Sequence, residues 1–174
     1  MNHIVFQSKC QGYSHIKSDL ECQDSTLVKK TEKYAIAVVA DGHGSASYFR
    51  SSRGSLFATE AAITAIEELL ETILSDKSNM DDFCASIDKH LIQLERSVIA
   101  RWHERVEDDY SKNPFLDSEI LKVDEKHKEK YLKGERIEAA YGSTLIAVAC
   151  TDAFWFGIHI GDGKCITCDY RGNF

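Results

Sequence analysis

The chain has 174 residues, of which 43% are hydrophobic and 28% charged, and its formal net charge is −7. This length suits one domain with a single hydrophobic core and is short for two. The acidic balance has no basic run to offset it, so it argues against a nucleic-acid-binding surface and against binding to an anionic membrane.

The first predicted elements are strands. Residues Ile4–Lys9 have the character of a short strand. Residues Asp24–Lys30 and Tyr34–Asp41 predict a pair of strands joined by a polar turn at residues 31–33. The second member of this pair is apolar on both faces, which predicts a central strand that is covered on both sides.

Helical periodicity follows. Between about Ser45 and Ser75 apolar residues recur at spacings of three, four or seven, which predicts a long amphipathic helix; they are Leu56, Ile63, Ile66, Leu70 and Ile73. The polar stretch SDKSNMDD interrupts this pattern and supplies capping residues. A second helix is predicted from Phe83 to about Val106, and the short link between the two predicts an antiparallel pair.

The rest of the chain divides into a charged segment and further strands. Residues 107–138 are mostly charged and contain the only proline, which predicts an exposed insertion that is partly helical from Asp117 onward. Strands are predicted again at Gly142–Cys150, Ala153–Ile160 and Lys164–Tyr170, separated by tight turns. The chain stops where the return strand of a hairpin would begin. We therefore expect residues 1–174 to form a single domain that is truncated, or that another segment completes.

The cysteines and the N-terminal residues indicate the cellular compartment in which the protein is expected. The first ten residues, MNHIVFQSKC, do not have the pattern of a secretion signal, and no apolar run approaches the roughly 18 residues of a membrane span. The six cysteines are therefore interpreted as reduced thiols in a cytoplasmic protein. The spacing of Cys165 and Cys168 matches half of a zinc site, but without a second pair an ordinary strand is the preferred interpretation.

The stretch YAIAVVADGHGSASYF carries the main chemical signal. A buried strand delivers Asp41 to the rim of a sheet, where a rigid carboxylate is a good ligand for a hard cation. Gly42 lets the backbone bend toward an ion, so its carbonyl is a further candidate ligand. His43 would then project beside the site, suited to proton transfer near neutral pH. The alternative is a simple turn in which Asp41 or Ser45 caps the following helix.

Four features occur in a specific order along the chain. They are a Gln–Asp segment at residues 23–24, an apolar strand that runs into Asp–Gly–His–Gly, two long helices, and Gly–Ser–Thr–Leu followed by Gly–Asp–Gly. This order of features resembles that of the metal-dependent 2C-type serine/threonine protein phosphatases. The residues SHIK…CQDS are most similar to those of a bacterial branch of that family. The resemblance covers nearly all of this chain, but only the N-terminal part of the family domain.

The resemblance implies an α+β fold: an antiparallel β-sandwich flanked by long antiparallel helices, here incomplete at the C-terminus. It also implies two Mn²⁺ or Mg²⁺ ions, bridged by Asp41, with the Gly42 carbonyl as a further ligand and Asp24 as the early acid. His43 matches the proposed general acid of the family. The implied substrate is a phosphoprotein, hydrolysed at phosphoserine or phosphothreonine by a metal-activated water.

The chain departs from the family pattern in three places. Gln23 replaces a common Glu, and Asp19 stands where an arginine often holds the substrate phosphate, so that His15 or Lys17 would have to take over that role. The later metal-binding aspartates have no match. We therefore expect the chain to be inactive alone. The alternatives are a catalytically silent phosphatase-like module that binds or regulates, and a metal-free structural domain.

Overall fold

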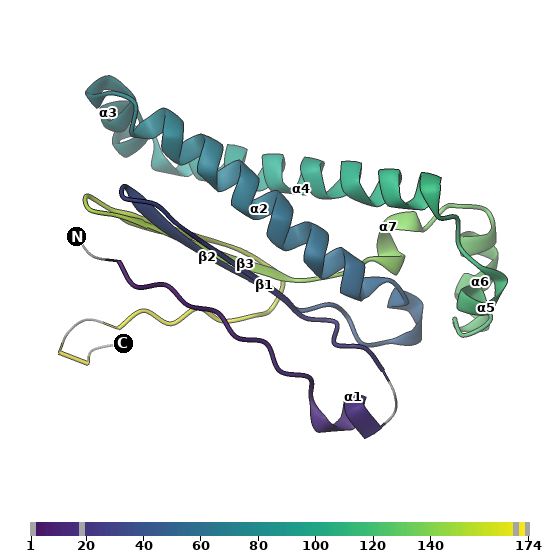
Figure 1. Ribbon diagram of the computed structural model, residues 1–174. Helices are drawn as coiled ribbons and strands as arrows, with labels where there is room; N and C mark the ends of the chain where they lie inside the picture. Colours follow the sequence, from purple (N-terminus) through teal and green to yellow (C-terminus); the bar gives the residue numbers. More distant parts are fainter. Residues whose placement is uncertain (1–2, 18–19, 169–170, 173–174) are drawn as a thin grey trace.

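Residues 3–17, 20–168 and 171–172 are described by the structure, a computed structural model (Figure 1). They form an α+β fold built on a four-stranded antiparallel sheet in the order β1-β2-β3-β4. The strands are β1 (Ser25–Lys30), β2 (Tyr34–Ala40), β3 (Leu145–Thr151) and β4 (Trp155–Ile160). The predicted pairing of the first two strands is thus confirmed, and so is the hairpin formed by the later two.

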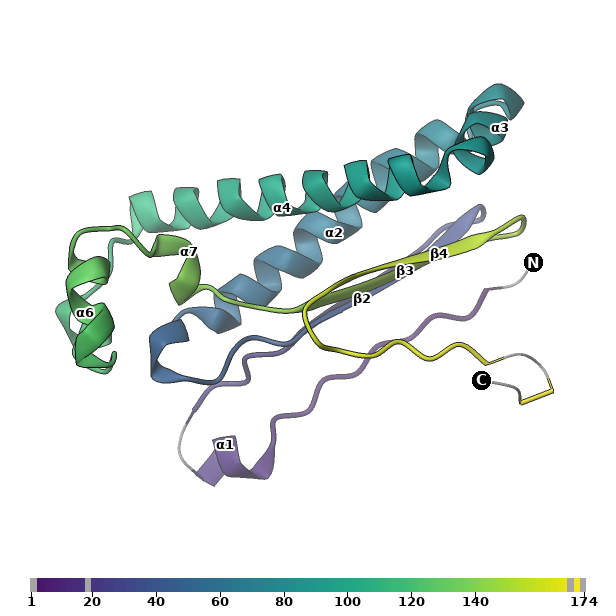
Figure 2. The ribbon, with the colours of Figure 1, turned by 180° about the vertical axis from the view of Figure 1, so that it is seen from behind.

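Helices occupy one side of this sheet. After the short 3-10 helix η1 (Ala46–Tyr48) come α2 (Ser51–Ile73), α3 (Lys77–Ala85) and α4 (Ile87–Lys112). Helix α2 packs directly on the sheet, and α4 packs against α2 and runs back along it (Figures 1 and 2). Within the described ranges, no helix has the length and apolar character needed to cross a bilayer.

The predicted second helix is wrong in its bounds, because the backbone breaks inside it. Ser86 leaves the helical region with φ −138° and separates α3 from α4, and α4 continues beyond Val106 to Lys112. Asp76 caps α3 by accepting a hydrogen bond from the Asn79 backbone N–H at 2.9 Å. The polar stretch therefore starts a helix of its own.

The main core lies between the sheet and α2. Strand β2 turns Ile36, Val38 and Ala40 toward the helices, and these side chains are buried. Helix α2 meets them with the small side chains of Ala61 and Ala62, which let the helix approach the sheet closely. Burial of such apolar surface contributes about 25 cal/mol per Å², so this contact fixes the direction in which each strand faces.

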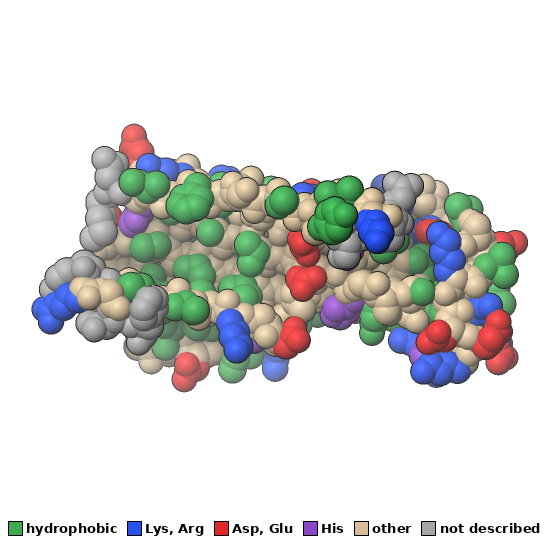
Figure 3. Space-filling model, turned by 90° about the horizontal axis from the view of Figure 1, so that it is seen from below, with side chains coloured by type: hydrophobic (Ala, Val, Ile, Leu, Met, Phe, Trp, Pro, Cys, Tyr) green, Lys and Arg blue, Asp and Glu red, His purple; other side chains and the backbone are tan. Residues whose placement is uncertain are grey.

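The opposite face of the sheet is open. Val39 is 50% exposed there, so the described residues cover β2 on one face only, and the predicted cover on both sides is not found among them. By strand alternation this open face carries mainly apolar side chains: Val28, Ala35, Ala37, Val39, Ile146, Val148, Cys150 and Trp155. Figure 3 views the molecule from this side and shows hydrophobic side chains gathered between two bordering chain segments.

Those bordering segments come from the two ends of the chain, and both pass beneath the open face (Figures 1 and 2). Residues 3–12 form no strand, which corrects the prediction for Ile4–Lys9. Residues 163–168 likewise form no strand, which corrects the prediction for Lys164–Tyr170 as far as Cys168; residues 169–170 lie outside the described residues. These segments cross the face rather than extend an edge, so no ladder of backbone hydrogen bonds forms.

The charged segment at residues 107–138 is partly helical, as predicted, and it also packs. It holds α5 (Asp117–Ile120) and α6 (Glu125–Leu132), and α7 (Ile137–Ala140) follows. A second hydrophobic cluster forms here, called the insertion core, which consists of Val106, Ile120, Val123, Tyr131, Ala140 and Tyr141. Most of its charged residues therefore lie on the outside of a packed unit, while Asp109 and Glu119 are partly buried.

Arg50 ties this unit to the start of α2. Although Arg50 directly precedes a helix, it is not a surface residue, because only 5% of it is exposed. Its guanidinium binds both carboxylate oxygens of Glu119 at 2.9 Å and donates to the Tyr141 hydroxyl at 2.8 Å. It also donates to the backbone carbonyls of Asn113 at 2.6 Å and Pro114 at 3.1 Å. All five guanidinium N–H groups thus have acceptors, which is what a buried cation requires.

Replacing Arg50 with Met should therefore destabilise the protein strongly. The variant keeps an apolar stem but removes the guanidinium donors from both carboxylate oxygens of Glu119 and from two backbone carbonyls. Breaking such an ion-pair network at a buried arginine costs up to about 3–5 kcal/mol. Arg53→Met is the matched control, because Arg53 is 48% exposed and pairs with Asp109 near the surface, where such pairs contribute about 0–1 kcal/mol. Urea unfolding would measure both. Equal losses in the two variants would contradict this account of Arg50.

The same network predicts loss of stability in acid. Burial raises the pKa of Glu119, but the hydrogen bonds from Arg50 and the Leu116 N–H, together with the charges of Arg50 and Arg53, outweigh it, and the pKa is lowered. A carboxyl group whose folded pKa lies below its unfolded value stabilises the protein above the unfolded value, and this contribution is lost as the pH falls through the folded pKa. Stability should fall below about pH 4, and Arg50→Met should weaken that dependence. An unchanged pH profile in the variant would count against it.

Candidate functional site

The register of β1 and β2 brings Asp24 and Asp41 together. Ser25 pairs with Ala40 in the antiparallel ladder, so the next residues outward, Asp24 and Asp41, lie opposite each other at the rim. Side chains directly opposite on antiparallel strands share one face. Because Ala40 points toward the helices, both carboxyl groups project from the open face. The sequence prediction placed these two acids on neighbouring strand ends, and the structure brings them together there.

Burial and the neighbouring Asp24 both affect the ionisation of Asp41. Partial burial raises the pKa of Asp41, and the charge of Asp24 and a hydrogen bond with it raise this pKa further. The charge of His43 acts in the opposite direction, and Asp162 adds a smaller repulsion. Two like charges held this close favour either a proton or a cation between them. This is the electrostatic condition expected of a cation-binding site.

Hydrogen bonds hold the backbone of Asp41 in place. Its carbonyl accepts from the Thr144 N–H at 2.8 Å and from the Ser143 hydroxyl at 3.1 Å. Its own N–H donates to the Thr144 hydroxyl oxygen at 3.2 Å. Sequence analysis missed this role of Ser143 and Thr144, whose only local signal was their position at the start of a strand.

Gly42 is required by close packing. A Cβ atom at this position would lie 2.5 Å from the Gln23 carbonyl oxygen and 2.7 Å from that of Ser51. The Gly42 N–H donates to the Gln23 carbonyl at 3.2 Å. Among the described residues we find no hydrogen bond to the Gly42 carbonyl, so this oxygen remains a candidate cation ligand.

His43 sits in a tightly fitted position beside the acids. Its ring packs edge-on against Tyr48 with 4.6 Å between centroids, and its backbone N–H donates to the Gly142 carbonyl at 3.0 Å. A Cβ atom at Gly142 would lie 2.6 Å from His43 Nδ1, and Nδ1 is buried with no hydrogen-bond partner found in the described part of the chain. These contacts fix the ring and leave Nε2 as the nitrogen suited to proton transfer.

The insertion core supports the loop that carries His43. The Tyr131 hydroxyl donates to the Ser47 carbonyl at 2.6 Å, and the Phe49 ring packs against the rings of Phe115 and Tyr131. The Arg50 N–H closes the loop by donating to the Ala140 carbonyl at 2.9 Å. No side chain caps η1 or α2, so the capping roles considered for Asp41 and Ser45 are not observed.

A hollow of about 300 Å³, called the rim pocket, opens beside the acids. Asp24, Asp41 and Asp162 line it from the rim of the sheet, together with Thr144. Residues 8–10 of the N-terminal segment line its other side. Figure 3 shows acidic side chains gathered where the apolar open face ends.

The predicted phosphate-binding residues are elsewhere. His15 and Lys17 belong to the short helix α1 (Tyr13–Lys17) and are not among the residues that line the rim pocket. Asp19, the position where the family often has arginine, lies outside the described residues. The Gln23 side-chain amide oxygen lies 3.5 Å from where a Cβ of Gly44 would be, so Gln23 lies beside the turn that carries His43.

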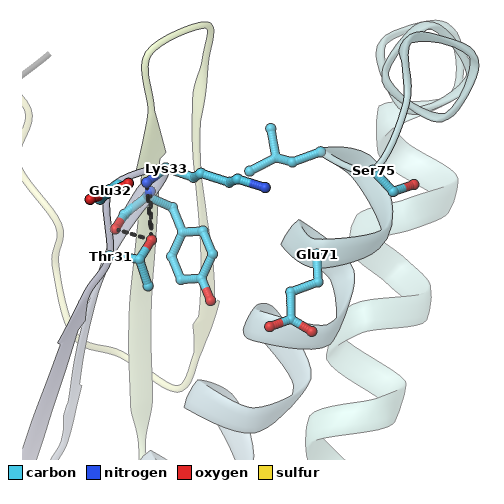
Figure 4. A pocket seen from close by; sticks show the side chains of 7 residues that line it. Thr31, Glu32, Lys33, Glu71 and Ser75 are labelled. Carbon is cyan, nitrogen blue, oxygen red and sulfur yellow. Dashed lines mark hydrogen bonds between the residues drawn. The ribbon is translucent and has the colours of Figure 1, made fainter.

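A larger pocket of about 530 Å³ lies at the far end of the sheet, between the β1–β2 turn and the end of α2. Lys33 reaches across it from the turn, and Glu71 faces it from α2 (Figure 4). Tyr34 also lines this pocket, and its hydroxyl group donates a hydrogen bond to Glu67. Burial and this hydrogen bond raise the pKa of Tyr34 to about 12. This phenol therefore stays protonated at neutral pH, and the pocket offers no cluster like that of the rim.

The rim residues fit part of a cation site. Two neighbouring carboxylates and a free carbonyl are hard oxygen ligands of the kind that Mg²⁺ and Mn²⁺ accept. However, in the part of the chain that the structure describes, no group of three His, Cys, Asp or Glu side chains is arranged to hold a metal. The donors present are thus fewer than a closed metal site would have.

Comparisons with known proteins give one result. A family model described as Protein phosphatase 2C matches residues 11–174, which is nearly the whole chain. The search of curated proteins found no match, and neither did the search of solved structures.

Replacing Asp41 with Asn should stabilise the protein slightly when no divalent cation is present. The folded pKa of Asp41 is raised, so its ionised form is disfavoured in the native state and stability falls as the pH rises through that pKa. Removing the charge should raise the free energy of unfolding by less than about 1 kcal/mol at pH 7, because solvent screens the site. Thermal unfolding with and without Mn²⁺ would measure this. The wild type should gain further stability on adding Mn²⁺, and Asp41→Asn should not.

The exposed Asp81 in α3 provides the control, since Asp81→Asn removes the same charge far from the rim. This variant should gain as much stability from Mn²⁺ as the wild type does. An Asp41→Asn variant that is less stable than the wild type without cation would contradict the repulsion described here.

Proposed function

The chain belongs to the protein phosphatase 2C family, and from this we propose that it forms the N-terminal part of a catalytic domain that hydrolyses phosphoserine and phosphothreonine in proteins. The observation that carries the proposal is the placement of Asp24 and Asp41 side by side at the rim of the sheet. These are the positions that the family pattern assigns to metal-binding acids. The substrate would be a phosphoprotein.

Asp24, Asp41 and the Gly42 carbonyl would hold Mn²⁺ or Mg²⁺, with Asp41 between two ions in the complete domain. Bound divalent ions lower the pKa of water toward neutrality and offset the negative charge of a phosphoryl group. The contribution of this chain is to fix its own oxygen atoms. The bonds from Ser143 and Thr144 keep the Asp41 backbone from moving when its side chain binds.

His43 would donate a proton to the leaving alkoxide of serine or threonine. Two observations support this role. The His43 ring is fixed by its packing against Tyr48, and His43 lies close enough to Asp41 for its charge to oppose the rise in the pKa of that carboxyl group. A protonated imidazole beside the scissile bond speeds such a step by about 10²–10⁴-fold. The demand for this proton depends on the leaving group, and an alkoxide needs it far more than a nitrophenolate does.

We further propose that residues 1–174 belong to one domain and that a second sheet covers the open face, giving the sandwich that the family resemblance implies. The apolar side chains on that face support this, because such a surface is costly to leave in water. Residues 107–138 would be an insertion that braces the His43 loop. The reduced state of Cys10, Cys22, Cys84, Cys150 and Cys165 is compatible with a cytoplasmic location.

A silent binding or regulatory module is the second candidate. The observation that favours it is the shortage of metal-binding side chains around the rim among the described residues. Such a module would bind phosphoproteins or partner proteins without hydrolysing them. The two candidates differ in turnover, which makes an activity assay decisive.

The test is hydrolysis of p-nitrophenyl phosphate and of a phosphoserine peptide with Mn²⁺, using the protein that contains this chain. Asp41→Asn should lower kcat/KM by about 10²-fold or more on both substrates, because it weakens the shared ligand. His43→Ala should lower kcat much more on the phosphopeptide than on the nitrophenyl ester. Wild-type turnover in Asp41→Asn would refute the proposed mechanism, and equal losses in His43→Ala would refute its role as an acid.

A further inference from the structure

We propose that Lys9 binds the phosphoryl group of the substrate in the rim pocket. This inference rests on the proposed function and deepens it by naming the group that recognises the phosphomonoester dianion. It replaces the two sequence candidates for that role with a residue from the N-terminal segment. Three observations carry it: the place of Lys9, the anchoring of its segment, and the charge of the pocket.

Lys9 lines the rim pocket opposite the acids of the sheet. Its neighbours Ser8 and Cys10 line the same hollow, so this stretch forms one wall of it. Asp24 and Asp41 form part of the other wall. A phosphoryl group seated between these walls would lie between the candidate cation ligands and the lysine, and this is the arrangement that a phosphate clamp requires.

The segment that carries Lys9 is anchored to the fold on both sides of it. On one side, Gln7 Oε1 accepts a hydrogen bond from the Thr26 hydroxyl at 3.1 Å, and Thr26 itself lines the rim pocket. On the other side, the Gln11 amide donates to the Leu20 carbonyl. The position of Lys9 beside the pocket is therefore held by specific contacts.

The charge of the pocket creates the need for a cation. Three of the residues that line it are acids, namely Asp24, Asp41 and Asp162, and they would repel a phosphate dianion. Lys9 is the one basic side chain among the described lining residues. No ion pair of Lys9 with another described residue is found, so its ammonium group is available to a ligand. Lysine binds phosphate as a flexible point charge, which suits a group on a bordering segment.

His15 and Lys17 do not meet these conditions. Both lie on α1, and neither lines the rim pocket. The sequence drew attention to them because they are close to Asp24 along the chain. The structure shows that Lys9, which is farther from Asp24 in sequence, shares a pocket with it.

The experiment compares Lys9→Gln and Lys9→Arg with Lys33→Gln in the protein that contains this chain. Lys33 is the matched control, because it lines the pocket at the far end of the sheet (Figure 4). With Mn²⁺ present, two quantities are measured: the Kd for inorganic phosphate, and kcat and KM on a phosphoserine peptide. Lys9→Gln should raise both Kd and KM about tenfold, which corresponds to 1.4 kcal/mol, with kcat changing less than KM. Lys9→Arg should retain most of the binding, and Lys33→Gln should equal the wild type.

The outcomes separate this inference from the proposed function. If the wild type binds phosphate through Lys9 but does not turn over substrate, the catalytic proposal fails and the inference stands. If the protein is active and Lys9→Gln binds phosphate as the wild type does, the inference fails alone. A tenfold loss in Lys17→Gln or His15→Gln with none in Lys9→Gln would also overturn it. Absence of phosphate binding by the wild type would overturn it as well.

Discussion

The candidate site depends on the register of one pair of strands. Because Ser25 faces Ala40, the acids just beyond them must face each other, and their shared side follows from which way Ala40 points. The core decides that direction, since Ile36, Val38 and Ala40 are buried against α2. A slip of one residue would turn the acids toward the helices and expose the core residues of β2. Hydrophobic packing thus specifies the position of two charges.

A network of polar and aromatic contacts holds the loop at the rim in place. The loop from Gly42 to Phe49 has no regular structure apart from η1, yet it carries His43. The insertion core holds it through Tyr131 and Phe49, and Arg50 fixes its end to Glu119. A buried, fully hydrogen-bonded cation favours one arrangement strongly, because any other leaves its partners unpaired. The charged segment that looks like a solvated insertion is, on one side, the support of this loop.

Local patterns predicted much of the fold and the pair of acids. The strands around Asp24 and Asp41 have clear alternation and a short turn, so their pairing could be inferred from adjacent residues. Arg50 could not be assigned this way, because its partners lie 63 to 91 residues away in sequence. An arginine after a turn has the same local signature whether it is buried or exposed. The same limit applies to Lys9, whose place depends on a segment that crosses a sheet face without pairing to it.

The rim also contains the arrangements that a stable fold would otherwise avoid. Two carboxyl groups repel each other there, His43 Nδ1 is buried without a partner among the described residues, and Gly42 and Gly142 fill positions where any side chain would collide. The buried Arg50, by contrast, has an acceptor for every guanidinium N–H. Natural proteins keep such locally unfavourable features mainly where function needs them, and the surrounding packing offsets their cost. At this rim the repelling acids, the unpartnered His43 Nδ1 and the two glycines occur together, and this combination supports the placement of the candidate site there.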